Sequence, residues 1–244
     1  RRNIRRPEYV PLKLMPTSSC SVLVQNRRWH VFVSTAELEM AAVRTIIQAA
    51  QQSIEQRHAF RIVLAGGTTP RPVYERLRAC DTDWSAWHVY FGDERCLPVD
   101  DAERNSLMAA QAWLDHVAIP KSQVFPIPAE RGAPAAAAAY AITLSGIESF
   151  DLVLLGLGED GHTASLFPNE ARSDCASDAA AIAVLAAPKP PAQRVSLSAS
   201  RLGAARQVIF LVSGAGKRQA VTDWRNGLAI PAAEIKPADG VDIY

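Results

Sequence analysis

The spacing of apolar residues along this chain changes repeatedly between the short runs typical of buried strands and the wider spacing typical of helices. The run at 150–155 is the most apolar and predicts a strand that is buried on both faces. Together, the runs that predict strands cover residues 29–33, 61–65, 87–91, 150–155, 182–186, 194–198 and 208–212.

Helices are predicted between most of these strands. Ser34 and Glu37 have the spacing of a capping box at the start of the first helix, and Pro70 suits the first turn of the second. Further helices are predicted over 106–116, over the alanine-rich 134–144 and over 217–224. The apolar face of the first helix is predicted to consist of Met40, Val43, Ile47, Ala50 and Ile54.

Alternating strands and helices predict an α/β fold in one domain, with a mostly parallel central sheet and helices on both faces. We expect this domain to cover 29–244 and residues 1–28 to form an N-terminal extension and lead-in. The start is basic but is not followed by the apolar stretch of a signal peptide, and Met15 is a possible natural first residue. Ligands of such sheets bind beyond the carboxyl ends of the strands.

Charge and cysteine usage narrow the class of protein. The formal net charge of the 244 residues is +1, which favours neither nucleic acid nor a strongly charged protein partner. No apolar run approaches the roughly 20 residues that span a bilayer. The four cysteines lack the spacing of a zinc site, and free thiols in a reducing, cytoplasmic compartment are the expected state of Cys20, Cys80, Cys96 and Cys175.

Three polar or glycine-rich segments follow predicted strand ends. The first contains Gly66, Gly67 and Thr68 and leads into a helix, so its backbone N–H groups and the helix dipole favour phosphate. Its spacing is not that of a dinucleotide or nucleoside triphosphate loop. A tight turn that merely requires glycine explains this segment equally well.

The second segment carries the charges of Asp93, Glu94 and Arg95. Arg95 can hold an anion with its planar guanidinium group, whereas an exposed ion pair is the alternative. Consecutive carboxylates on a strand point to opposite faces, so we expect at most one of them in a site.

The third segment, 156–162, is the most specific. Histidine accepts a proton near neutral pH, and His162 is surrounded by glycines after the most apolar strand. Asp160 lies two residues earlier and can reach this histidine or a reacting water. No serine-nucleophile motif is present, and further metal ligands at a recognisable spacing are missing, so we expect no metal.

The three segments, in this order, resemble the 6-phosphogluconolactonase family. The matching stretches are 66–70, 91–98, 156–168, 188–197 and 213–217, and the resemblance covers about residues 30 to 242. It implies the Rossmann-like fold of glucosamine-6-phosphate deaminases, no cofactor, and hydrolysis of 6-phospho-D-glucono-1,5-lactone in the pentose phosphate pathway. The expected partner is this small phosphorylated sugar lactone, and the chain is expected to be a monomer or a weak homo-oligomer.

The resemblance also implies roles for particular residues. His162 would be the general base, with Asp160 and Arg95 beside it as catalytic groups. The resemblance leaves open which of Arg95, Arg194 and Lys217 contacts phosphate, and whether Asp160 or Asp93 tunes the base. The implied substrate-binding residues are Gly66, Gly67, Thr68, Asp93, Asn105, Arg194 and Lys217.

Two other functions have to be compared with this one. Amino-sugar-phosphate deaminases carry a glutamate that partners the histidine, but Phe167 stands at that place, and Arg95 replaces their usual tyrosine. A sugar-phosphate-sensing domain of a regulator would need a DNA-binding segment, and the residues before Trp29 are too few and too rich in proline for a helix-turn-helix.

Overall fold

Seven parallel strands form the central sheet of the computed structural model, which describes residues 25–168 and 179–244. The order across the sheet is β1-β10-β9-β6-β2-β3-β5, so β6 lies at the centre. Its strands are β1 (Arg27–Trp29), β2 (Phe60–Leu64), β3 (Trp87–Phe91), β5 (Val124–Phe125), β6 (Phe150–Gly156), β9 (Ala205–Leu211) and β10 (Val241–Ile243).

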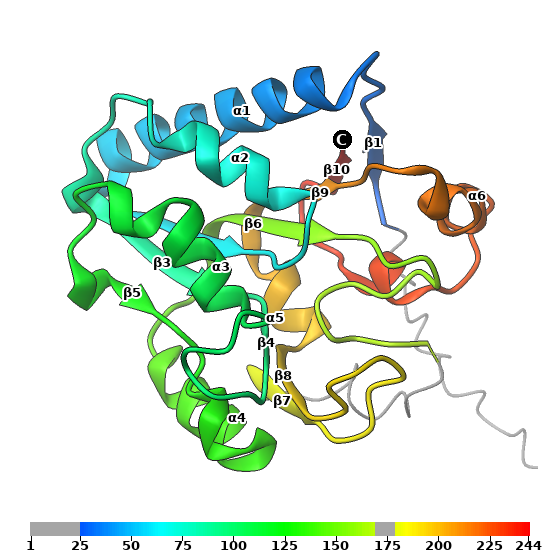
Figure 1. The fold of residues 1–244 in the computed structure, drawn as a ribbon. Helices are drawn as coiled ribbons and strands as arrows, with labels where there is room; N and C mark the ends of the chain where they lie inside the picture. Colours follow the sequence, from blue (N-terminus) through cyan, green and yellow to red (C-terminus); the bar gives the residue numbers. More distant parts are fainter. Residues whose placement is uncertain (1–24, 169–178) are drawn as a thin grey trace, which may run out of the picture.

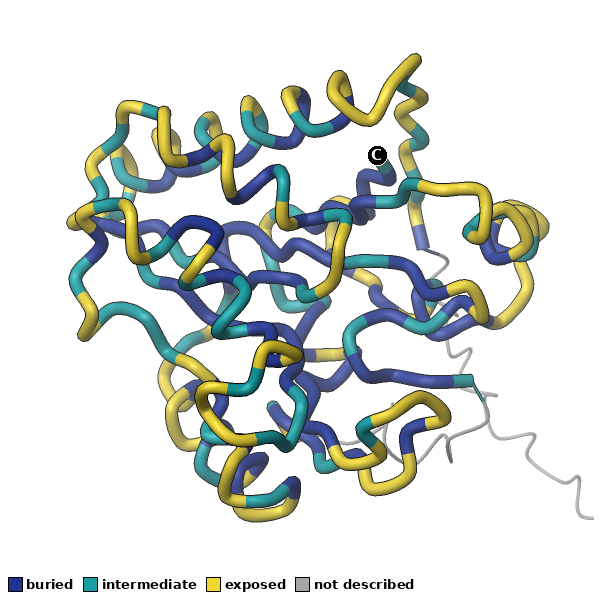
Figure 2. The backbone as a smooth tube through the Cα atoms, viewed as in Figure 1, coloured by how far each residue is buried: buried dark blue, intermediate teal, exposed yellow. Residues whose placement is uncertain are grey.

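Helices cover both faces of this sheet, as predicted. Figure 1 shows α1 and α2 above the sheet, and α4 and α5 below it. The strands β2, β3, β6 and β10 are almost entirely buried, whereas the edge strands β1 and β5 are partly exposed and the helices alternate between buried and exposed residues (Figure 2). The helices are α1 (Thr35–Arg57), α2 (Pro70–Leu77), α3 (Asn105–Ala112), α4 (Ala133–Thr143), α5 (Ala199–Gly203) and α6 (Arg218–Arg225).

A second, antiparallel sheet of three strands was not predicted. The segments predicted at 182–186 and 194–198 are strands, but they pair with each other and with β4 instead of joining the central sheet. β4 begins directly after the bend at Gly92, which ends the parallel pairing of β3. The small sheet has the order β4 (Asp93–Arg95), β8 (Arg194–Leu197), β7 (Ala181–Val184).

Two details of the first hundred residues differ from the predictions. β1 ends at Trp29 instead of Val33, because its partner β10 ends at Ile243; Val31 and Val33 are exposed. Helix α1 does start at a Ser34 cap that accepts from Glu37 N. Its buried face, however, is shifted by about one position: Met40 is exposed, and the fully buried hydrophobic residues are Ala42, Ile46 and Ala50.

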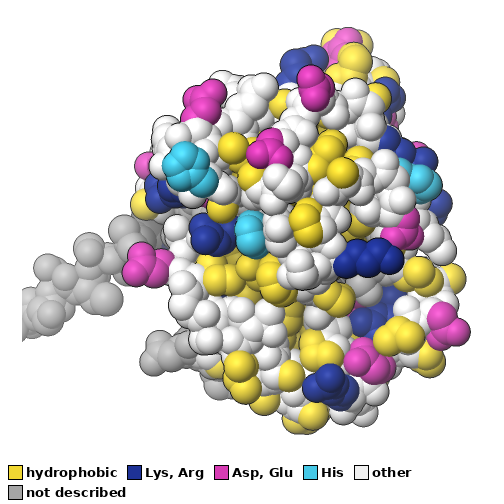
Figure 3. Space-filling view, turned by 90° about the vertical axis from the view of Figure 1, so that its left-hand side faces the viewer, with side chains coloured by type: hydrophobic (Ala, Val, Ile, Leu, Met, Phe, Trp, Pro, Cys, Tyr) yellow, Lys and Arg dark blue, Asp and Glu magenta, His cyan; other side chains and the backbone are white. Residues whose placement is uncertain are grey.

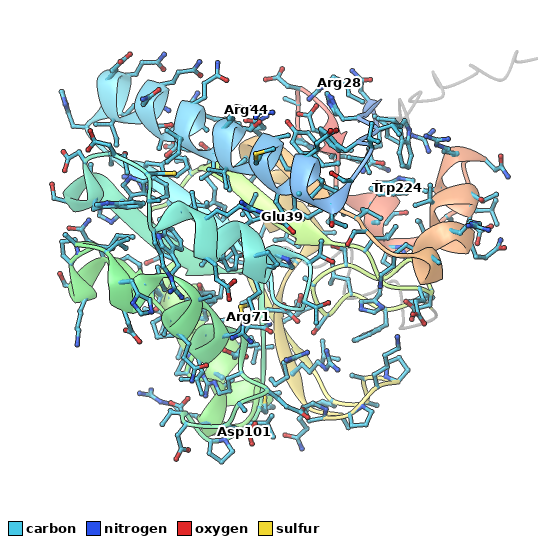
Figure 4. All side chains as sticks on the ribbon, turned by 45° about the horizontal axis from the view of Figure 1, so that its top comes forward. Arg28, Glu39, Arg44, Arg71, Asp101 and Trp224 are labelled. Carbon is cyan, nitrogen blue, oxygen red and sulfur yellow. The ribbon has the colours of Figure 1, made fainter. Side chains whose placement is uncertain are left out.

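Residues 25–28 belong to the described fold, and the rest of the expected N-terminal extension lies outside the described residues. β1 is held at the edge of the sheet by Asp242 of β10, which accepts from Arg28 and contacts His30 Nε2 at 2.9 Å. Burial alone raises the pKa of Asp242, but its hydrogen bonds with Arg28, His30 and Gln207 hold that pKa below its ordinary value. Figure 4 labels Arg28, close to the start of the described chain.

The outer surface carries charges of both signs. On the face drawn in Figure 3, lysine, arginine and acidic side chains are scattered among apolar ones and do not gather in one basic patch. Within the described residues, no helix combines the length and hydropathy needed to cross a membrane.

Candidate active site

A cleft of about 570 Å³ opens at the carboxyl ends of the central strands, where the predicted loops meet. Its size is typical of small-molecule sites. Asp160 lies outside its lining but contacts His162. The predicted residues that line the cleft are Gly66, Gly67, Thr68, Asp93, Arg95, Asn105, His162, Arg194 and Lys217.

The loop from Gly66 to Thr69 forms one wall of the cleft and ends at the first turn of α2. A side chain at Gly66 would overlap the amide of Asn105, and Gly67 has a φ of 95°, which favours glycine. Thr69 Oγ1 lies 3.3 Å from Ser213 Oγ, so the loop is joined to the segment that follows β9. Glycine is therefore needed here both for backbone conformation and for close packing.

Positive charge dominates the cleft. Among the described lining residues, the cationic side chains are those of Arg95, Lys189, Arg194 and Lys217, and the carboxylate is that of Asp93. Lys217 and Lys189 form no ion pair within the described ranges. The cleft is thus suited to an anionic ligand.

Arg95 and Arg194 are directly opposite each other in the β4–β8 pair. Like charges at such positions destabilise a sheet unless something compensates them. Arg95 donates from Nη1 to the Glu103 carbonyl, and Arg194 donates to the carbonyls of Pro191, Lys189 and Pro190. Arg194 therefore also holds the 186–193 loop over the cleft.

The imidazole of His162 is paired with the carboxylate of Asp160 through Nδ1. A carboxylate acceptor requires the proton on Nδ1, so Nε2 is the nitrogen left to accept a proton. Burial by itself raises the pKa of Asp160, but the hydrogen bond and charge interaction with His162 lower it to a value below its ordinary range. Asp160 therefore stays ionised at neutral pH.

Backbone geometry brings these two side chains together. Gly158 N donates to the His162 carbonyl at 2.7 Å, closing a tight turn. A side chain at Gly158 would overlap the His162 ring, and Gly161 has a φ of 84°. The glycines noted in the sequence are thus required for the Asp160–His162 contact.

Asp93 has a different environment. Its carboxylate accepts from Ser165 Oγ at 2.6 Å and from Asn105 Nδ2 at 3.0 Å, and no contact joins it to His162. Asp160 is therefore the carboxylate bonded to the histidine. Glu94 is fully buried, outside the cleft, and accepts from the backbone N–H groups of Asn105 and Ser106.

Three residues near the site were not predicted to belong to it. Lys189 lines the cleft from the β7–β8 loop, Phe167 packs on His162, and Ser165 bonds Asp93. In the sequence, Lys189 lies in a stretch that we noted for its family resemblance, so its charge could have been considered. Phe167 was noted in the sequence only as a difference from the deaminases, although it lies five residues from His162 in the same loop. Ser165 carries no local signal, because its partner Asp93 belongs to another segment.

Within the described residues, no three histidine, cysteine or acidic side chains are grouped so that they could hold a metal ion. Cys80 and Cys96 are free thiols, whereas Cys20 and Cys175 lie outside the described residues.

Comparison with known proteins identifies the class. A family described as glucosamine-6-phosphate isomerases/6-phosphogluconolactonase matches residues 33–244, a range that contains every described helix and strand except β1. The 6-phosphogluconolactonase of Mycobacterium leprae is 35% identical over 228 residues, which cover 88% of this chain and 91% of that protein. The chain thus belongs to the 6-phosphogluconolactonase family, whose members hydrolyse a lactone.

Solved structures agree with the fold. The 6-phosphogluconolactonase of Trypanosoma brucei has a TM-score of 0.80 at 30% identity, covering 90% of this chain and 95% of that one. A monomeric glucosamine-6-phosphate deaminase has a TM-score of 0.73 at 19% identity, covering 89% and 95%, and shows the shared fold alone. The predicted fold class is confirmed.

Proposed function

We propose that this protein hydrolyses 6-phospho-D-glucono-1,5-lactone to 6-phospho-D-gluconate, with His162 as the general base. The observation that carries this proposal is the Asp160–His162 pair at the edge of a cleft whose charged side chains are mainly cationic. The ligand must then be an anion whose reacting group needs a base and no covalent nucleophile. A phosphorylated δ-lactone meets both conditions.

The phosphate group is expected at the glycine loop. Backbone N–H groups from Gly66 to Thr68, at the entrance to α2, and the ammonium of Lys217 form the side of the cleft that suits it. Such a grip fixes the sugar ring, and binding energy from this remote group can be used at the reacting carbon.

The chemical step then consists of two proton transfers, one to His162 during attack by water and one from it when the ring opens. His162 Nε2 takes a proton from water as the water oxygen bonds to the lactone carbonyl carbon. The tetrahedral oxyanion is stabilised by the Arg95 guanidinium. When the bond between this carbon and the ring oxygen breaks, the ring oxygen leaves with the proton returned by the imidazolium, and a free acid and a hydroxyl group result.

The residue at position 167 favours hydrolysis over deamination. Deaminases of this fold need a carboxylate that partners the histidine at this place, and the buried ring of Phe167 packs on the imidazole instead. It leaves Asp160 as the acid partner of His162.

A direct assay tests the proposal. Purified protein is added to freshly made 6-phosphogluconolactone, and proton release is followed at constant pH against the spontaneous rate. We expect catalysed release with the lactone and no ammonia from glucosamine 6-phosphate. Tight binding of the lactone without turnover would instead support a sensing domain. The pathway, a cytoplasmic location and a monomeric or weakly associated state stay predictions of the sequence.

A further inference from the structure

Ser165 joins the loop of His162 to the small sheet. It is fully buried, and its Oγ donates to Asp93 Oδ2 at 2.6 Å. Its backbone N–H donates to Ser196 Oγ at 3.3 Å. Asp93 and Ser196 are register partners on β4 and β8, so both polar groups of Ser165 bind one cross-strand pair.

The same small sheet carries Arg95. Arg95 follows Asp93 by two residues on β4, and His162 precedes Ser165 by three residues in its loop. The loop of His162 follows β6 of the central sheet, whereas Arg95 is the last residue of β4 in the small sheet. The bond from Ser165 to Asp93 is therefore a short connection between the base and the arginine.

The backbone next to Ser165 adopts an unfavourable conformation. Ala164 has a φ of 48°, a left-handed value that a residue with a side chain rarely adopts. Strained backbone of this kind persists where its neighbours hold it on both sides. Here Thr163 Oγ1 donates to the Gly156 carbonyl at 2.8 Å on one side, and Ser165 is bound to the small sheet on the other.

The connection continues to the glycine loop. The second oxygen of Asp93 accepts from Asn105 Nδ2, and the amide of Asn105 packs against Gly66. One buried carboxylate thus receives hydrogen bonds from the histidine loop and from the residue that supports the proposed phosphate site. Because Asp93 is 7% exposed, water replaces a lost donor poorly.

We propose that Ser165 is a positioning residue, which sets the separation between the His162 imidazole and the Arg95 guanidinium through Asp93. The inference rests on the proposed lactonase function. Ser165 touches neither substrate nor water in this scheme. Asn105 Nδ2 also donates to the Asp93 backbone carbonyl at 3.0 Å, so its support of the glycine loop does not depend on the Ser165 hydroxyl. Loss of this hydroxyl should therefore lower turnover and leave substrate binding nearly unchanged.

The test compares Ser165→Ala with Ser198→Ala. Ser198 is an equally buried serine that caps α5 through Arg201 N and lies outside the cleft. We expect kcat of Ser165→Ala to fall about tenfold to a hundredfold, the range for losing a hydrogen bond to a charged group. KM should change less than about twofold, as should kcat of Ser198→Ala.

Ser165→Cys is the second variant, and it serves as the test if Ser165→Ala does not fold. Its thiol is a weak hydrogen-bond donor of similar volume, so its kcat should lie between those of the wild type and Ser165→Ala.

A double-mutant cycle tests the route. If Ser165 acts through Asp93, the variant that combines Ser165→Ala with Asp93→Asn should be no slower than the slower single variant. Multiplied losses would overturn the inference. So would a kcat above half the wild-type value in both Ser165→Ala and Ser165→Cys.

A separate readout distinguishes this failure from failure of the proposed function. The imidazole NMR signal of His162 can be assigned by its disappearance in His162→Gln, since the chain has 5 histidines. We expect this signal to shift or broaden in Ser165→Ala and to stay unchanged in Ser198→Ala, even if the wild-type protein does not hydrolyse the lactone. An identical signal in both variants contradicts the positioning role.

Discussion

The ring of Phe167 lies against the imidazole of His162, with ring centroids 4.7 Å apart and an angle of 41° between the planes. The guanidinium carbon of Arg194 lies 5.5 Å from the centroid of the same Phe167 ring. Phe167 is buried, so this contact limits how the imidazole turns. The aromatic side chain thus supports the base from one side while Asp160 holds Nδ1.

Replacing this ring by an aliphatic side chain should weaken catalysis moderately. Aromatic pairs contribute about 0.5–1.5 kcal/mol beyond buried area, so Phe167→Leu should lower kcat about two- to tenfold. Phe125→Leu is the matched control, since Phe125 stacks on Tyr90 with the same 4.7 Å centroid distance away from the cleft. Equal kcat values for the two variants would show that the ring contact with His162 has no role.

Removal of the base should have the largest effect on turnover. His162→Ala should lose about 10²–10⁴-fold in kcat after subtraction of spontaneous hydrolysis, and bind substrate nearly as before. The exposed His116, replaced by alanine, serves as the control. Retention of more than about a tenth of wild-type turnover by His162→Ala lies outside the general-base range and removes His162 from the mechanism.

The pH profile follows from the ionisation of Asp160. Its pKa lies below the ordinary carboxyl value, so the carboxylate is already ionised where histidine side chains release their proton. Activity should therefore rise with pH as a single group deprotonates. Asp160→Asn should lower kcat, because an amide does not stabilise the imidazolium. Initial rates across the acid and neutral range measure both effects, and a profile that rises with two groups contradicts this assignment.

Lys217 should act on binding. Losing one charge-assisted contact costs about 1.5–3 kcal/mol, so Lys217→Ala should raise KM about ten- to a hundredfold. Arg218→Ala is the control, because this exposed neighbouring cation does not line the cleft. Unchanged KM and kcat in Lys217→Ala would show that the phosphate does not contact this side chain.

Asp242 should contribute to stability in a pH-dependent way. Its pKa is lowered in the folded state, so its contribution is present above the ordinary carboxyl pKa and is lost as the pH falls through the lowered value. Asp242→Asn should lower the free energy of unfolding by about 1–3 kcal/mol at neutral pH and less at strongly acidic pH. Urea unfolding at several pH values measures this, with exposed Asp239→Asn as the control. A constant difference at all pH values contradicts the ion-pair explanation.

The sequence by itself determined the central architecture and the loops of the site. A βα alternation, the apolar run of β6 and glycines at strand ends are local properties, and parallel strands necessarily bring their carboxyl ends to one edge. That is why Gly66, Arg95 and His162, which are far apart in the chain, could be assigned to one site. The sequence also placed Asp160 within reach of His162, because the two residues are only two positions apart.

Only the tertiary structure decided which partners these residues have. In the antiparallel sheet, β4 pairs with β8, which lies about a hundred residues further along the chain, and no local pattern encodes this pairing. For the same reason the sequence left open whether Asp93 or Asp160 bonds the histidine. Folding placed the buried Ser165 hydroxyl and the Asn105 amide on the Asp93 carboxylate, and a carboxylate held by these two donors is not bonded to His162.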